Sequence, residues 1–358
     1  MRGSAPARAA HELPHDEHKI DALLVSGLPN VRYLTGYTGS NGLVLWTPES
    51  MILFTDPRYS IQAAQESSCA VKIARGPLYL AAAQAIQRKR LKRIGFERSR
   101  LIYDTYRALK EALPLGSSLK PVGPIVDQFR MIKSDAEIDQ IRRSVQTNSA
   151  AFELAVGQIR AGISELELAA ELDYQMRKLG AQKAAFETIV AFGTRTALPH
   201  AQPTPERLKG DELVLIDMGA CQNGYSSDMT RMLSLGKPHA KNQAMYDAVL
   251  QAQLAGIAAV RPGVTAQQVD RAARQALKAA GLDKAFVHST GHGLGLEIHE
   301  APRLGKKDKT RLAAGMVITI EPGAYVEGTG GVRIEDTVLV TSKGCEVLTP
   351  TPKELRVL

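Results

Sequence analysis

Short apolar runs separated by turn residues dominate the first 130 residues of the chain. Three runs have the length and composition of strands, and the third ends at an Asp-Pro turn. Helical segments lie between and after them. Strands are expected at 21–26, 42–46 and 51–55, and helices near 59–66, 78–90 and 104–112. Strands that alternate with helices predict an α/β domain.

A domain boundary is predicted near residue 130. Residues 121–124 begin and end with proline and resemble a linker. Ser134 and Glu137 then form a capping box, which satisfies free backbone amides at the start of a long amphipathic helix. We therefore expect a smaller N-terminal α/β domain over residues 1–130 and a larger domain over residues 131–358.

The second part of the sequence contains an internal repeat. A glycine turn followed by a capping box occurs at residues 160–167 and again at 261–268. Three further pairs follow in the same order at similar offsets: His200 with His299, Asp217 with Glu321, and Asp228 with Glu335. Four matches in one order at nearly one offset indicate a duplication. The two halves are expected to pack about a pseudo-twofold axis and to direct their acids toward the centre.

Four acids occupy matched positions of this repeat, and each is expected within an otherwise apolar strand. They are Asp217, Asp228, Glu321 and Glu335. An ionised carboxylate in apolar surroundings is costly, and four together repel one another. Lys and Arg are not present in matching numbers at these positions. A pair of divalent cations held by shared carboxylates would resolve the charge.

A fifth ligand is predicted at His292, inside the glycine-rich run 289–300. The flanking glycines let backbone and substrate approach closely. The other half has no matching histidine, so one metal is expected to carry an additional imidazole. Four carboxylates and one imidazole form a hard, oxygen-rich site, which favours Mn²⁺ and tolerates Co²⁺, Fe²⁺ or Zn²⁺. The run lacks the spacing of phosphate or dinucleotide loops.

The overall composition is that of a globular protein, with 44% hydrophobic and 23% charged residues. No run approaches the roughly 18 apolar residues of a membrane span. Residues 1–18 contain no apolar block, so we expect a disordered leader and not a secretory signal. Three widely spaced cysteines without zinc-type spacing indicate a reducing cytoplasm.

The net charge of +8 is concentrated in the first domain. Residues 1–130 hold 18 Lys and Arg against 11 Asp and Glu, and residues 131–358 hold 27 against 26. A basic domain attracts anionic partners, including nucleic acid. The densest cluster, residues 88–93, lies at the end of a predicted helix, where exposed cations complement the helix dipole. Nucleic acid is therefore not an expected partner, although a non-catalytic nucleic-acid- or protein-binding protein remains the alternative of another class.

The segment from Gly291 to Glu300 resembles the proline-peptidase signature of the pita-bread metallopeptidases, in particular of the Xaa-Pro peptidases (prolidase and aminopeptidase P). The order of the five predicted ligands also matches that family, and residues 30–36, 39–42 and 55–59 resemble its first domain. Methionine aminopeptidases lack that domain, and creatinase-like relatives lack the ligand set. The resemblance implies an α+β pita-bread catalytic domain with an internal duplication, preceded by a smaller α/β, creatinase-like domain.

The resemblance also implies roles for the predicted ligands. Asp228 and Glu335 would bridge two metals, Asp217 would complete one of them, and His292 with Glu321 would complete the other. A hydroxide between the metals would attack the bond before proline in peptide substrates.

Further roles follow from the same resemblance. Glu321 would carry the proton, and His200 and His299 would stabilise the tetrahedral intermediate and line the proline pocket. Tyr325 would lie near the substrate, and Arg333 would orient the acids. Thr230 and Thr337, two residues after Asp228 and Glu335, share a strand face with these acids and are candidates to support them.

The sequence leaves open whether the substrate is a dipeptide or a longer peptide. A dipeptidase must recognise the free carboxylate after proline, and Arg58 could do so, across a dimer interface as the family often arranges. The alternative is that Arg58 stabilises the turn after Asp56 and Pro57. We favour a cytoplasmic, homodimeric Xaa-Pro dipeptidase, with a Xaa-Pro aminopeptidase as the alternative.

Overall fold

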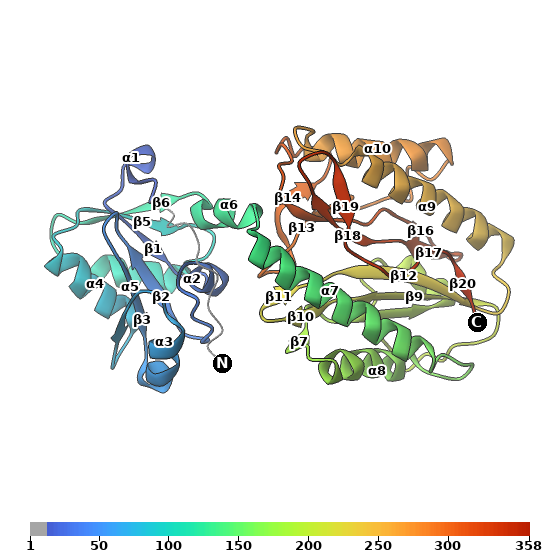
Figure 1. The fold of residues 1–358 in the computed structure, drawn as a ribbon, viewed down its shortest axis with the longest axis horizontal. Coiled ribbons are helices and arrows are strands. Elements are labelled where there is room, and N and C mark those ends of the chain that lie inside the picture. Colours follow the sequence, from blue (N-terminus) through green and yellow to red (C-terminus); the bar gives the residue numbers. More distant parts are fainter. Residues whose placement is uncertain (1–12) are drawn as a thin grey trace. The chain divides into compact units, whose positions relative to one another are not determined.

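The computed structural model describes residues 13–358, which divide into two compact units, one ending at Arg130 and the other beginning at Met131 (Figure 1). Most of the expected disordered leader lies outside the described residues. Its end, His15–His18, forms the single-turn helix α1, so the expectation of disorder is wrong there. None of the described helices is long and apolar enough to cross a membrane.

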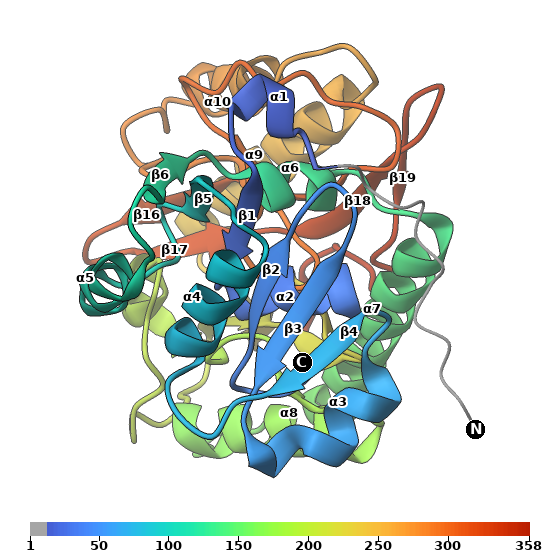
Figure 2. The same cartoon turned by 90° about the vertical axis from the view of Figure 1, so that its left-hand side faces the viewer.

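The first unit is built on one mixed six-stranded sheet with the order β4-β3-β2-β1-β5-β6. Its strands are β1 (Ala22–Val25), β2 (Leu43–Trp46), β3 (Met51–Thr55), β4 (Ala70–Ile73), β5 (Arg93–Glu97) and β6 (Ser118–Val122). Its helices are α1, α2 (Leu28–Thr35), η1 (Pro57–Tyr59), α3 (Ser60–Glu66), α4 (Leu78–Arg88), α5 (Tyr103–Ala112) and α6 (Ile125–Met131), which ends at the boundary. Helices α4 and α5 pack on one face of the sheet, where Ile86 and Leu109 join the core around Leu24 and Phe54 (Figure 2).

The three strands and three helices predicted in this unit are all present, but the predicted linker is wrong. Residues 121 and 122 belong to β6, in which Pro121 lies opposite Phe96 of β5. A strand at the edge of a sheet tolerates proline, because one of its sides has no ladder partner to bond. The boundary region is therefore occupied by β6 and α6.

The second unit contains two larger sheets, with the orders β20-β12-β9-β8 and β14-β13-β15-β18-β19, and the smaller sheets β11-β10-β7 and β16-β17. The strands before residue 240 are β7 (Lys183–Ala184), β8 (Ile189–Phe192), β9 (Glu212–Met218), β10 (Ala220–Gln222), β11 (Tyr225–Ser226) and β12 (Met229–Leu235). The later strands are β13 (Gly291–Gly293), β14 (Glu300–Leu304), β15 (Val317–Ile320), β16 (Gly323–Val326), β17 (Gly330–Arg333), β18 (Asp336–Val340), β19 (Cys345–Val347) and β20 (Arg356–Val357).

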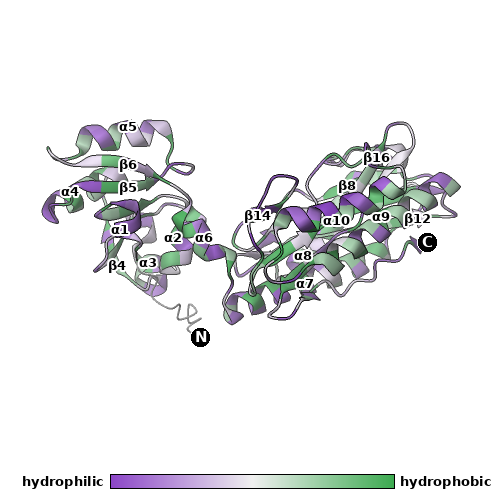
Figure 3. Cartoon of the chain, turned by 90° about the horizontal axis from the view of Figure 1, so that it is seen from above, coloured by the Kyte–Doolittle hydropathy of each residue, from purple (hydrophilic) through white to green (hydrophobic). Residues whose placement is uncertain are grey.

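Two pairs of helices enclose these sheets from opposite sides (Figure 1). One pair is α7 (Asp135–Val156) and α8 (Glu165–Lys178), and the other is α9 (Ala240–Ala259) and α10 (Ala266–Ala279); the short helix η2 (Gly193–Ala197) follows β8. Phe152 of α7 and Leu172 of α8 pack on Val214 of β9, whereas Val269 of α10 packs on Ile318 of β15. Much of the outward surface of α10 is hydrophilic (Figure 3), as expected of a helix that buries one face only.

The capping boxes predicted from the sequence open three of these helices. Ser134 with Glu137 opens α7, and the repeated boxes Ser164–Glu167 and Thr265–Gln268 open α8 and α10. The equivalence of the last two supports the duplication at the level of backbone geometry.

The two halves of the second unit repeat a hydrogen-bonded turn ahead of these boxes. Gly162 and Gly263 both have φ of +86°. Their amides donate to the carbonyls of Leu208 and Leu312, at 2.8 Å in both halves. The arginine before each leucine donates back to the carbonyl of the same glycine, at 2.5 and 2.8 Å. Such matching detail in two distant segments is what a duplicated fold produces.

We predict that Gly162→Ala and Gly263→Ala destabilise the protein by similar amounts. A Cβ at either position meets no atom within 4 Å, so the cost arises from the left-handed backbone alone, at about 1–2 kcal/mol each. Urea unfolding of the two variants measures it. Gly344→Ala is the control, because that glycine has open space without a positive φ. Equal stability of all three variants would contradict the prediction.

Candidate metal centre

Four acids and one histidine line a single cleft of about 580 Å³ in the second unit. Asp217 lies within β9, Asp228 directly precedes β12, Glu321 directly follows β15, and Glu335 directly precedes β18. The prediction that all four lie inside strands is therefore wrong for the last three. At a strand end the ladder no longer constrains the chain, so acids from both sheets can converge without interrupting strand pairing.

His292 lies at the middle of β13, between the two glycines noted in the sequence. A Cβ at Gly291 would overlap the backbone of Thr319, and a Cβ at Gly293 would overlap the backbone of Ala301. Only glycine fits at either position, because neighbouring strands approach β13 this closely. The glycines thus place His292 deep in the sheet.

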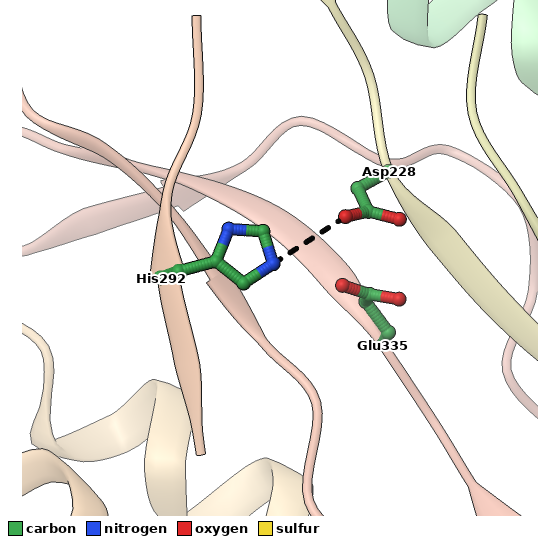
Figure 4. A group of neighbouring side chains, drawn as sticks. All are labelled: Asp228, His292 and Glu335. Atoms are coloured by element: carbon green, nitrogen blue, oxygen red, sulfur yellow. Dashed lines mark ion pairs between the residues drawn. The ribbon is translucent and has the colours of Figure 1, made fainter. Parts of the chain in front are cut away.

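The imidazole of His292 is oriented toward the acids. Its Nε2 atom lies 3.4 Å from Oε1 of Glu321 and 3.6 Å from Oδ2 of Asp228. Its Nδ1 atom lies 3.0 Å from the carbonyl oxygen of Gly293, and donation there leaves the Nε2 lone pair facing the cluster. Asp228, His292 and Glu335 each offer one possible ligand atom, and these three atoms lie within 4.8 Å of one another (Figure 4).

The carboxylates of this cluster carry more negative charge than their surroundings neutralise. Burial, followed by the charge of Glu335, raises the pKa of Asp228 well above its usual range. Burial, followed by the charge of Glu321, likewise raises the pKa of Glu335, and burial raises the pKa of Glu321 to about 7. Oδ1 of Asp217 and Oε1 of Glu335 are buried and have no hydrogen-bond partner among the described residues. Buried acceptors without donors, together with raised pKa values, fit a site for divalent cations.

Arg333 is a buried cation in contact with the cluster. It donates to Oδ2 of Asp217 at 2.5 Å, to Oγ1 of Thr230 at 3.0 Å and to the hydroxyl of Tyr325 at 2.8 Å. Arg333 belongs to the second half of the duplication, and its guanidinium contacts the acid of the first half. A single guanidinium neutralises one of four carboxylates, which leaves the case for metal ions intact.

Two threonines connect the halves. Thr230 donates to Oε2 of Glu335 at 2.8 Å, and Thr337 donates to the backbone carbonyl of Asp228 at 2.9 Å. The spacing in the sequence predicts that each threonine supports the acid two residues before it, and the structure shows instead that each contacts the acid of the other half. The alternation of side chains along a strand does not extend to these acids, because both precede the first residue of their strands.

Both predicted non-ligand histidines line the same cleft. His200 and His299 are exposed, in contrast to the acids. The ring of His299 lies 4.5 Å from the ring of His292, at an interplanar angle of 74°. The duplication therefore brings two solvent-facing imidazoles into the cleft that holds the acidic cluster.

Two predicted substrate-binding residues have other surroundings. Tyr325 does not line the cleft. Its hydroxyl accepts from Arg333 and lies 2.9 Å from Nε2 of His288. Arg58 belongs to the first unit, where Nε and Nη2 each donate to a different oxygen of Asp56 at 2.9 Å. This two-point ion pair matches the alternative that Arg58 stabilises a turn.

Several polar residues of the cleft were not predicted from the sequence, among them His288, Glu187 and Arg303. His288 precedes His292 by four residues in the same approach to β13, a spacing that could have indicated it. Burial, followed by the charge of Arg333, lowers the pKa of His288 to about 4, so it is neutral near pH 7. Glu187 and Arg303 also line the cleft. Glu187 had no local signal, since only the pairing of β8 with β9 brings its segment to the acids.

Comparisons with known proteins agree with this architecture. The family described as metallopeptidase family M24 matches residues 139–342, and the creatinase/prolidase N-terminal domain matches residues 14–132. The chain therefore belongs to metallopeptidase family M24. The predicted resemblance to the pita-bread Xaa-Pro peptidases and the predicted fold class are confirmed.

Individual relatives are similar over nearly their whole length. The chain is 39% identical to a Xaa-Pro dipeptidase of Pyrococcus horikoshii, with 95% of each chain covered. A solved structure of a Xaa-Pro dipeptidase from Bacillus anthracis has a TM-score of 0.93 and 40% identity, and 96% of each chain is covered. The X-Pro aminopeptidase from Thermotoga maritima has a TM-score of 0.89 and 35% identity, over 95% of this chain and 98% of that one.

The metal-free protein is predicted to lose stability as the pH rises. The pKa of Glu321 is raised to about 7 in the folded state, from an ordinary value of 4.5. Its contribution to stability is therefore present below pH ~4.5 and lost as the pH rises through ~7, on the order of 3 kcal/mol. Thermal unfolding of chelator-treated protein from pH 5 to 8 measures this loss.

The control for this prediction is Glu321→Gln, which cannot ionise and should show a shallower decline over the same pH range. Added Mn²⁺ should restore wild-type stability at pH 8, because cations compensate the ionised carboxylates. If wild type and Glu321→Gln lost stability equally between pH 5 and 8, the loss could not be assigned to ionisation of Glu321.

Proposed function

We propose that this protein is a metal-dependent Xaa-Pro dipeptidase, which hydrolyses the peptide bond before proline. The observation that carries the proposal is the convergence of four carboxylates, three of them buried, and His292 in one cleft, with two carboxylate oxygens left without donors among the described residues. The relatives described as Xaa-Pro dipeptidases support the substrate class. Proline-containing peptides are accordingly the proposed partners of the cleft.

The proposed metal content is two divalent ions per chain, with Mn²⁺ preferred and Co²⁺ or Zn²⁺ as alternatives. Asp228 and Glu335 would contact both ions, Asp217 would hold one, and His292 with Glu321 would hold the other. Bound ions would supply Lewis acidity, which lowers the pKa of water and polarises a carbonyl group. Arg333 fixes Asp217, and Thr230 fixes Glu335, so the ligands keep their orientation before any ion binds.

The remaining residues of the cleft would act on the peptide itself. His200 and His299 are exposed beside the acids and can donate to the carbonyl oxygen of the scissile bond. Glu321 would hold a proton at its carboxylate and pass it to the leaving proline nitrogen. That nitrogen carries no N–H in the substrate, so recognition cannot depend on a donor there. Shape and imidazole contacts must select the proline ring.

A dipeptidase also needs a cation for the carboxylate that follows proline. Arg58 is engaged by Asp56, whereas Arg303 lines the cleft and has only a long contact there, from Nε to the hydroxyl of Ser289 at 3.3 Å. We therefore assign the carboxylate contact to Arg303 in preference to Arg58. A Xaa-Pro aminopeptidase remains the second candidate, in line with the related Thermotoga maritima structure.

The cellular setting belongs to the same proposal. No disulfide joins Cys69, Cys221 and Cys345 in the described part of the chain, in keeping with the reducing cytoplasm proposed for the protein. A homodimer is proposed from the family resemblance alone.

Metal removal is predicted to abolish hydrolysis of a Xaa-Pro dipeptide, and Mn²⁺ to restore it with two ions bound per chain. Glu335→Gln should reduce the bound metal and lower kcat/KM by about 10³-fold or more, since a bridging oxygen is lost. Elemental analysis and a peptidase assay measure both effects.

Glu346→Gln is the matched control, because this exposed acid pairs with Arg142 and does not line the cleft. This substitution should leave the amount of bound metal and kcat/KM unchanged. Salt-sensitive binding of duplex DNA or RNA without hydrolysis would support the non-catalytic alternative instead.

Substrate length is predicted to depend on Arg303. Arg303→Ala should lower kcat/KM for a Xaa-Pro dipeptide by about 10–100-fold, as expected for one lost charge-assisted contact, and should affect a Xaa-Pro-Yaa tripeptide less. Arg58→Ala, the comparison variant, should affect both substrates equally. A selective loss of dipeptide hydrolysis in Arg58→Ala would return the carboxylate contact to that residue.

A further inference from the structure

A buried ion pair beside the cleft has no part in the chemistry described above. The side chain of Lys133 is 1% exposed, and its Nζ atom lies 3.1 Å from Oε2 of Glu300, whose side chain is 6% exposed. Removing two charges from water is costly, so a buried pair contributes little to net stability, and a specific positional role is a reasonable hypothesis for it. Neither residue is among the proposed metal ligands.

Glu300 directly follows His299 in the chain. Its second oxygen, Oε1, accepts from the backbone amide of Glu297 at 3.1 Å. A Cβ at Gly295 would lie 2.8 and 3.0 Å from the two carboxylate oxygens, so the carboxylate packs directly against the start of the loop. Residues 295–300 therefore fold around this one carboxylate, and His299 projects from the fold into the cleft.

The same loop is bonded to the chain that carries a proposed metal ligand. The carbonyl of Gly295 accepts from the amide of Ser226 at 2.7 Å, two residues before Asp228. The ring of His299 also contacts the ring of His292. A shift of the loop would consequently move His299 relative to the centre of the cleft.

Lys133 reaches this loop from a rigid support. Its backbone amide donates to the carbonyl of Gly315 at 2.9 Å. The next residue, Ser134, is the N-cap of α7 and is held by the capping box with Glu137. The ammonium group of Lys133 thus comes from a fixed point outside the loop, and it contacts Glu300, the first residue of β14, where the loop ends.

We propose that Lys133 is a positioning residue, which holds the loop 294–300 through Glu300 and so aims the imidazole of His299 at the substrate. The inference rests on the proposed function, in which His299 contacts the scissile carbonyl. Without the ammonium group, Glu300 would be a buried carboxylate without its counter-charge, and it would turn toward water and take His299 with it.

The experiment compares Lys133→Met with wild type, both loaded with Mn²⁺. The substitution keeps the approximate length of the side chain and removes its charge. We expect kcat for a Xaa-Pro dipeptide to fall about 10–100-fold, as a displacement on the order of 1 Å produces, with KM nearly unchanged. Bound Mn²⁺ should remain at the wild-type level, and Lys133→Arg should recover part of kcat.

A double variant tests whether Lys133 acts through His299. If it does, Lys133→Met combined with His299→Ala should be no slower than His299→Ala alone, because the group being aimed is already absent. Arg142→Met is the matched control, since Arg142 lies on α7, the helix that begins two residues after Lys133, but pairs with the exposed Glu346, and it should leave kcat unchanged. Losses that multiply in the double variant would overturn the proposal.

Amide hydrogen exchange gives a readout that does not depend on catalysis. The peptide covering residues 294–300 should exchange faster in Lys133→Met than in wild type, and at the wild-type rate in Arg142→Met. Glu300→Gln serves as the second variant if Lys133→Met does not fold, with the same expected increase. Unchanged exchange would overturn the proposal. Absence of hydrolysis by wild type would instead reject the proposed function, while the exchange result would still decide whether Lys133 holds the loop.

Discussion

Repulsion between buried carboxylates is the constraint on which the second unit depends. Asp217, Asp228, Glu321 and Glu335 line one cleft, and the neighbouring guanidinium of Arg333 contacts one of them. The pKa values of three of these acids are raised, so the cluster retains protons when no further cations are bound. Sheets, helices and capping boxes therefore hold together groups that would otherwise separate, and this is characteristic of a site prepared for metal ions.

The duplication explains how two sheets can hold such a cluster. Each half supplies two acids, and each half also supplies the threonine that supports an acid of the other half. The interface between the halves is thus bonded through the residues of the site itself. Asymmetry enters with His292, which has no counterpart in the first half and stands where the glycines of β13 let neighbouring strands come close.

The cleft differs in character from its centre to its edge. Acids fill the interior, whereas the exposed imidazoles of His200 and His299 lie where a peptide would enter. Glu187 and Glu300 add negative charge to the lining, and Arg303 adds positive charge. A small zwitterionic peptide is complementary to such a surface, since its amino and carboxylate groups carry opposite charges. The buried pair of Lys133 and Glu300 extends this organisation to the loop behind His299.

Local patterns in the sequence determined much of this protein. Capping boxes and apolar runs predicted α7, α8, α10 and the early strands, because these signals act over a few residues. The repeat located the four acids, since a duplication preserves order and spacing. The linker assigned to residues 121–124 was wrong, because whether proline ends a strand or sits in an edge strand depends on which neighbour pairs with it.

Only the tertiary structure decided the partners of the site residues. Arg333 contacts Asp217 of the other half, although Glu335 is only two residues away in the sequence, and Thr230 contacts Glu335 across the halves. Glu187 reaches the cleft through the pairing of β8 with β9, and Lys133 meets Glu300 across 167 residues of sequence. The sequence by itself determined which side chains carry the chemistry, and the packing of the two halves decided which of them touch, because contacts between distant segments leave no local pattern.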